Sequence, residues 1–427
     1  MKRDKALLVL TLLTVTVFAV KAFPVFSAST VPPGWVDTSY HTSTALDVSR
    51  GDLDSLMQPW WHIQGNSEMV QGLPVIDRNS KTFYYPPFLH VFIAGFMLFL
   101  PTGLATIISV SLIYSLAVPA TYLLSRSYKL GREASLLGAG IAGASIPLLH
   151  SQLMGFWSFA TAFIFGIASF SLYRLYRRNR ERKYLAGYIF AGLASVLTHW
   201  VFGAFIIGMP LFDTILERKQ LDWKIPGLAL AVMLPNYIAF FATSSIGSYI
   251  TTSFEKFYPS ISPVIVIAGI GLSREKYRTI DIFSAGSLTG AVLYYLGAPI
   301  PFGGMIQFAL PLLAGFYTAS IYSSTDMEEL RKAFTVLAAI FIAASFFAQA
   351  SIGSGAPRAV SEEQFQDLID ARSKVGDKIV VPAEGVDTWV TLASGENRIM
   401  NPYAQYNASE LDSDVFYTLF SEQEGIS

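Results

Sequence analysis

Long apolar runs divide this chain and constrain its fold more than any other feature. They cover residues 6–25, 87–100, 104–124, 135–149, 156–176, 184–197, 201–216, 226–241, 261–272, 282–296, 305–322 and 333–350. Hydrocarbon admits only helices or closed barrels, because an unsatisfied backbone group costs several kcal/mol there. Charged residues make up 14% of the chain, against about 25% in soluble domains. The sequence therefore predicts an all-α protein that crosses a membrane many times.

Basic residues in short loops predict the orientation of these helices. If every apolar run crosses the membrane, the basic cluster at residues 126–132 lies on the outer side. The sides of all later basic clusters are then inverted as well. This conflict with the expected cytoplasmic side of basic residues disappears if run 87–100 does not cross the membrane. The run has Pro86-Pro87 at its start and would lie at the outer side as a re-entrant or interfacial helix. We expect eleven crossings in the plasma membrane, with a cytoplasmic N-terminus and an extracytoplasmic C-terminus. A full crossing by run 87–100 is the alternative.

Two domains are expected from the distribution of apolar residues. Residues 1–352 form the membrane domain, in which run 6–25 is an uncleaved signal anchor and residues 27–101 are a long first outer loop. Residues 353–427 are less apolar and contain a helical pattern at 361–374 and a strand pattern at 378–382. They predict a small α/β appendage on the outer side. Asn407-Ala-Ser409 within it is a glycosylation sequon.

Several function classes are excluded by what the sequence lacks. The chain has no cysteine, so it has no disulfide or thiolate site, and its net charge of −1 gives no reason to expect a nucleic-acid partner. Motifs for phosphate-binding loops, dinucleotides, zinc proteases and serine hydrolases are absent. The apolar runs contain few ionisable residues, which ion-coupled transporters normally place at mid-membrane. Chemistry is therefore expected at the outer surface.

The first outer loop carries the best candidates for that chemistry. A helix starting near Asp37 would place Asp37 and His41 on one face. The carboxylate could then act as a general base or bind a divalent cation; capping of the helix N-terminus is the alternative, worth about 1 kcal/mol. Asp52 and Asp54 form an Asp-x-Asp triplet, which is either a metal ligand pair or a solvated acidic turn.

Short motifs along the chain resemble those of the GT-C superfamily of integral-membrane glycosyltransferases. This superfamily includes oligosaccharyltransferase catalytic subunits, protein O-mannosyltransferases and aminoarabinose transferases. The matching pieces are Asp37-x-x-Tyr40-His41, Gly72-Leu-Pro74, Tyr85-Pro86-Pro87, Leu197-Thr198-His199, Gln307 before Leu310-Pro311, and the segment 380–401.

The resemblance implies transfer of a hexosyl or pentosyl group from a polyprenyl- or dolichyl-phosphate donor to a glycan, lipid or protein acceptor at the outer face. Asp37 would be catalytic, and a cation such as Mg²⁺ or Mn²⁺ is left open, with Asp37, Asp52 and Asp54 as ligands. The residues expected to line the substrate site are His41, His62, Lys81, Tyr85, His90, His150, His199 and Gln307.

This sequence departs from the family pattern at two places. The second outer loop, residues 150–157, has no acid, and Gln307 replaces the family's late-helix arginine. Two alternatives therefore stay open. One is a transporter or flippase of lipid-linked saccharides, and the other is a non-catalytic scaffold.

Overall fold

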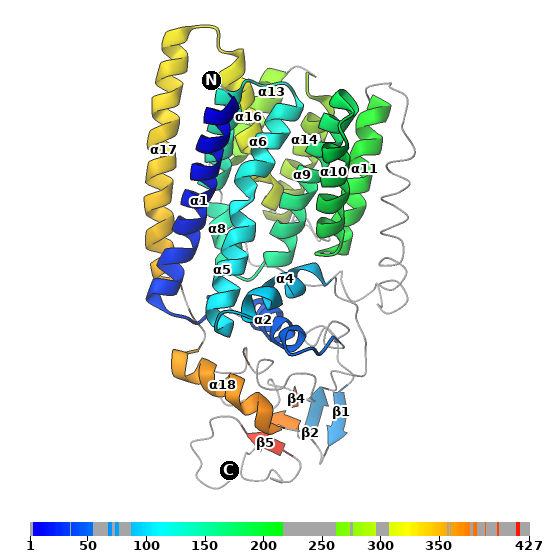
Figure 1. Cartoon of the computed structure of the whole chain (residues 1–427), viewed down its shortest axis with the longest axis vertical. Coiled ribbons are helices and arrows are strands. Elements are labelled where there is room, and N and C mark those ends of the chain that lie inside the picture. The colour runs from blue at the N-terminus through cyan, green and yellow to red at the C-terminus, as the bar shows by residue number, and fades with distance from the viewer. Residues whose placement is uncertain are drawn as a thin grey trace.

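The structure is a computed structural model and is mostly helical (Figure 1). It describes residues 3–34, 36–53, 67–70, 73–76, 87–216, 262–273, 276–295, 307–356, 358, 360–375, 379–381, 389, 399–400 and 416–418. The helices up to the longest gap are α1 (Arg3–Ala28), α2 (Val36–Ser49), α4 (Phe88–Met97), α5 (Thr102–Ser115), α6 (Ala117–Ser127), α7 (Arg132–Gly143), α8 (Ile146–Leu153), α9 (Trp157–Asn179), α10 (Arg182–Val196) and α11 (Trp200–Leu216). After it come α13 (Ser262–Ser273), α14 (Arg278–Tyr295), the 3₁₀ helix η3 (Gln307–Ala309), α16 (Leu310–Ser324), α17 (Glu328–Ser354) and α18 (Glu362–Val375).

Five helical stretches of the described chain are long and apolar enough to cross a membrane. They are Asp4–Ala28, Thr102–Ser127, Arg132–Leu153, Trp157–Asn179 and Glu328–Ser354. Two of them join consecutive helices, α5 with α6 and α7 with α8. Together with the apolar composition they support a multi-pass membrane protein, while the number of eleven crossings stays a prediction. The expected run 226–241 lies outside the described residues.

Close contact between α7 and α16 is made possible by glycine. A Cβ atom on Gly138 would lie 2.1 Å from the carbonyl oxygen of Gly315, and a Cβ on Gly315 would lie 2.4 Å from that of Gly138. Small residues let helix backbones approach closely in membranes, where the hydrophobic effect does not drive helix association. The two glycines therefore fix the spacing of these helices at the centre of the bundle.

The bundle has two ends of different construction. In Figure 1 the N-terminus lies at one end, while α2, α4, α18 and the strands lie at the other, which we call the α2 end. Helix α4 has 10 residues and is about 15 Å long, too short to span the hydrocarbon. The backbone N–H of Phe88 donates to the carbonyl of Leu197 at 2.7 Å, which holds the start of α4 against the connection between α10 and α11.

A small sheet at the α2 end joins two distant parts of the chain. Its strands are β1 (Ser67–Val70), β2 (Leu73–Ile76), β3 (Ile379–Val381), β4 (Ile399–Met400) and β5 (Phe416–Thr418), in the order β1-β2-β4-β3-β5. β1 and β2 form an antiparallel pair, with Val70 opposite Leu73. β2 pairs with β4, so strands from the expected first outer loop complete a sheet of the C-terminal segment. This sharing of one sheet by two distant segments was not expected from the sequence.

Replacing Gly315 with Ala is expected to lower thermal stability, because its Cβ meets backbone that cannot move aside. Gly286→Ala on α14 is the control, since nothing lies within 4 Å of a Cβ there. In a helix interior alanine is also more favourable than glycine by about 1 kcal/mol. We expect Gly315→Ala to lower the melting temperature in detergent by several degrees and Gly286→Ala to leave it equal or higher. Equal melting temperatures for the two variants would contradict the close contact.

Candidate functional site

The start of α2 is positioned by Gly34. Its φ of +107° is a conformation that side-chain-bearing residues rarely adopt, and a Cβ there would lie 2.3 Å from the Thr38 hydroxyl oxygen. The Thr38 hydroxyl donates to the Pro33 carbonyl at 3.1 Å. Asp37 is the second residue of α2, so this turn sets where its backbone lies, while its side chain is not described.

An ion pair holds the other half of α2 against α18. Arg372 of α18 pairs with Asp47, and both side chains are less than a tenth exposed. The same guanidinium donates to the Ser43 hydroxyl at 3.1 Å. Removing one partner of such a buried pair costs about 3–5 kcal/mol because a buried charge is left behind. The C-terminal segment thus fixes the helix that carries Asp37 and His41.

Three of the predicted histidines come together at the α2 end from three different elements. His41 lies on α2, His90 on α4, and His199 in the connection between α10 and α11, and all three are buried. His41 Nδ1 lies 2.9 Å from His90 Nε2, so one ring donates and the other accepts. The α4–Leu197 backbone bond brings His90 and His199 into one region.

These three imidazoles are held in the neutral form. Burial lowers the pKa of His90 and the pKa of His199 to about 3 each. The pKa of His41 is lowered well below its usual value, mainly by burial. Repulsion between protonated rings, from His90 and His199, lowers it further. Neutral imidazoles can donate and accept hydrogen bonds at the same time, which suits a site for polar groups rather than for a fixed anion.

Aromatic rings surround the histidines. The Trp157 ring stacks on His41 with centroids 5.7 Å apart, and Phe159 lies 4.3 Å from His199. Tyr40 meets His90 edge-on at 5.9 Å. Trp157 and Phe159 were not among the site residues expected from the sequence. A tryptophan and a phenylalanine at the start of a predicted span indicate an interfacial belt equally well.

The remaining predicted site residues either lie further from the three histidines or fall outside the described part of the chain. Gln307 begins η3, whose Phe308 packs on Phe159 with centroids 6.5 Å apart, so this element lies one ring away from His199. His150 lies half-buried on α8. His62, Lys81, Tyr85, Asp54 and the Asn407 sequon lie outside the described residues.

The geometry does not fit one metal ion shared by the predicted acids. Asp37 is the second residue of the 14-residue α2 and Asp52 lies three residues after its end. Such a helix is about 21 Å long, so a single ion cannot bind both. His41 Nδ1 and His90 Nε2 are hydrogen-bonded to each other, so these two nitrogens are not presented to a metal ion. Among the described residues, no three of His, Asp or Glu are grouped so as to hold a metal. Asp54 and the Asp37 side chain lie outside the described residues, so Asp37, Asp52 and Asp54 stay predicted metal ligands, with Asp37 apart from the other two.

No protein-family profile and no curated protein matches the sequence. Solved structures of similar fold do exist. An oligosaccharyltransferase from Archaeoglobus fulgidus matches with a TM-score of 0.60 and 12% identity, over 94% of this chain and 65% of that protein. ArnT from Cupriavidus metallidurans matches with a TM-score of 0.53 and 12% identity, over 90% of this chain and 83% of that protein. Both are GT-C glycosyltransferases.

The chain has the GT-C fold. The resemblance predicted from the short motifs is thus confirmed at the level of the fold. The chain spans less than two thirds of the length of the archaeal oligosaccharyltransferase. A further structure of this enzyme, called AglB, was solved with an inhibitory peptide and a dolichol-phosphate, with a TM-score of 0.55, 12% identity, and coverage of 93% of this chain and 64% of AglB.

The neutral histidines predict that the fold weakens in mild acid. Their pKa values are lower in the folded than in the unfolded protein, so the unfolded state binds more protons below about pH 6.5. Each histidine then lowers the free energy of unfolding by about 1.4 kcal/mol per pH unit. We expect the stability in mixed micelles to fall between pH 7 and pH 5, and His199→Gln to make this fall shallower. A stability that is flat over this range would contradict the burial of the three rings as neutral groups.

Proposed function

We propose that the protein is a membrane glycosyltransferase that moves a sugar from a polyprenyl- or dolichyl-phosphate-linked donor to an acceptor at the outer face of the membrane. The observation that carries this proposal is the GT-C fold over 94% of the chain, together with the histidines gathered around the start of α2. AglB was solved with a dolichol-phosphate, and another structure of the enzyme was solved with a tethered acceptor peptide. These ligands support a lipid-phosphate donor for this chain as well.

Asp37 is the proposed general base. It lies one helical turn before His41 on α2, and residues four apart share a helix face. An Asp37 directed like His41 would therefore face the histidine cluster. The acceptor nucleophile attacks the anomeric carbon, the bond from this carbon to the lipid-phosphate oxygen breaks, and the lipid phosphate leaves with the electron pair. Asp37 takes the proton from the acceptor.

His41, His90 and His199 are proposed to bind the sugar. Neutral imidazoles can pair with sugar hydroxyls as donors or as acceptors, and Trp157 and Phe159 supply apolar ring faces beside them. In this proposal Lys81 contacts the lipid phosphate, and His62, Tyr85, His150 and Gln307 complete the substrate site.

Replacing Asp37 with Asn tests the catalytic assignment. The protein is reconstituted in nanodiscs with radiolabelled sugars on a polyprenyl phosphate, and label moved to acceptors is counted. Loss of a general base is expected to lower the rate by 100-fold or more. Asp370→Asn is the control, because Asp370 is an exposed residue of α18 that pairs with Gln366.

Two outcomes would contradict the proposal. Transfer by Asp37→Asn at the wild-type rate would remove Asp37 as the base. No transfer by the wild type with any polyprenyl-phosphate sugar would favour the scaffold instead. Movement of intact lipid-linked saccharide between leaflets, without transfer, would favour the flippase.

A further inference from the structure

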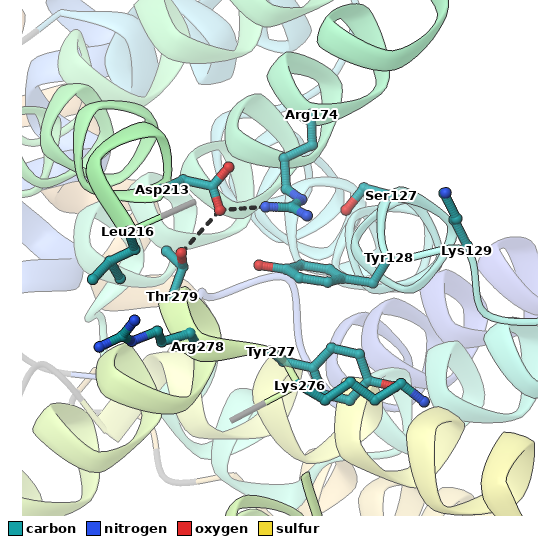
Figure 2. A pocket seen from close by; sticks show the side chains of 10 residues that line it. All are labelled: Ser127, Tyr128, Lys129, Arg174, Asp213, Leu216, Lys276, Tyr277, Arg278 and Thr279. Carbon is teal, nitrogen blue, oxygen red and sulfur yellow. Dashed lines mark hydrogen bonds and ion pairs between the residues drawn. The ribbon is translucent and has the colours of Figure 1, made fainter. Parts of the chain in front are cut away.

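A second polar site lies at the opposite end of the bundle from the histidines. A cavity of about 360 Å³ opens there between the end of α6, the later part of α9, the end of α11 and the start of α14 (Figure 2). These elements meet at the end where the N-terminus lies (Figure 1). From the sequence, the basic residues of this region predicted only the orientation of the helices in the membrane.

The inner wall of the cavity is a fixed ion-pair network. Arg174 of α9 pairs with Asp213 of α11 and lies over the Tyr128 ring, 3.9 Å from its centroid. The Thr279 hydroxyl donates to the same Asp213 oxygen at 2.9 Å, and Arg177 lies 3.8 Å from the other oxygen. Asp213 is nearly fully buried. Its negative charge is thus neutralised within the wall and is not presented to the cavity mouth.

The mouth of the cavity is cationic. Lys129, Lys276 and Arg278 line it, and all three are exposed. Figure 2 shows the two lysine ammonium groups on one side of the Tyr128 ring and the Arg278 guanidinium on the other. With Arg174, the described residues that line the cavity include four cations and one carboxylate. Arg278 and Thr279 begin the 18-residue α14, whose N-terminus adds a partial positive charge.

The turn after α6 holds one of these cations in an unfavourable backbone conformation. Lys129 has a φ of +65°, a region in which glycine is the usual residue at a helix end. The carbonyl of Leu130, the next residue, accepts a hydrogen bond from Arg126. The chain thus has a lysine where glycine would be less strained, and this lysine lines the cavity.

The surroundings of the cavity suit a ligand with an apolar tail. Phe212 and Ile215 flank Asp213 on α11, and Ile282 lies one turn into α14. Their side chains are 41%, 69% and 45% exposed. Large exposed apolar side chains on membrane helices face lipid, so acyl chains can lie next to the cationic mouth.

We propose that this pocket binds a phosphate group of an anionic ligand, with Lys129, Lys276 and Arg278 as its cationic contacts. Lysine and arginine are the usual partners of phosphate, and arginine can bind it through two parallel hydrogen bonds. Basic pockets between membrane helices are a known place for anionic lipid headgroups. The phosphate can come from a lipid or from a soluble ion, and the experiment distinguishes these sources. The proposal does not depend on glycosyl transfer.

The test compares two triple variants of the full chain in nanodiscs. The pocket variant is Lys129→Gln, Lys276→Gln and Arg278→Gln. The control variant, Arg182→Gln, Lys183→Gln and Lys332→Gln, removes the same charge from exposed residues at the same end of the bundle but outside the cavity. One arm measures phosphatidic acid bound from phosphatidylcholine discs by native mass spectrometry. The other arm measures inorganic phosphate binding in discs without anionic lipid by ³¹P NMR.

The pocket variant is expected to weaken phosphatidic acid binding roughly 100-fold, or about fivefold for each cation. The control is expected to change it less than about threefold. A pocket-specific loss in the phosphate arm alone would assign the site to a soluble phosphate compound, which also supports the proposal. Equal effects of the two variants, or no effect in either arm, would overturn it. Both variants should melt at the wild-type temperature, since the replaced side chains are exposed.

Discussion

A bilayer core contains no water, so polar groups buried there must find their hydrogen-bond partners within the protein. Many hydroxyls inside the bundle are satisfied by a carbonyl of their own helix. The hydroxyls of Ser171, Thr198 and Thr318, for example, donate to the carbonyl four residues earlier. Lys21 is an exception, because it is fully buried on α1 and its amine donates to Gln349 of α17 at 3.3 Å. Most remaining ionisable groups of the described chain lie at the two ends of the bundle.

The two ends use these groups in opposite ways. At the α2 end, three imidazoles are buried and stay neutral, because burial lowers their pKa values. At the other end, Arg174 and Asp213 are both charged and neutralise each other in the wall of a cavity, while further cations line its mouth. A neutral hydrogen-bonding site suits sugar hydroxyls. A cationic mouth suits a phosphate.

Local patterns were predicted well where helices were concerned. Residues near Asp37 were expected to begin a helix, and α2 begins at Val36. The run 87–100 was expected to form a helix that does not cross the membrane, and α4, with 10 residues, is too short to cross. The strands were a different case. The pairing of β2 with β4 joins residues more than 300 positions apart, and nothing local in the sequence specifies such a partner.

The apolar runs were enough to identify a helical membrane protein, because hydrocarbon admits only helices or closed barrels. The positions of the histidines and basic clusters near the ends of these runs can also be read from the sequence. Which of these residues meet depends on the tertiary structure. His41 and His90 are hydrogen-bonded although they are 49 positions apart in the sequence. Arg174 of α9 likewise pairs with Asp213 of α11. Such contacts depend on how helices pack, as does the close approach of Gly138 on α7 to Gly315 on α16.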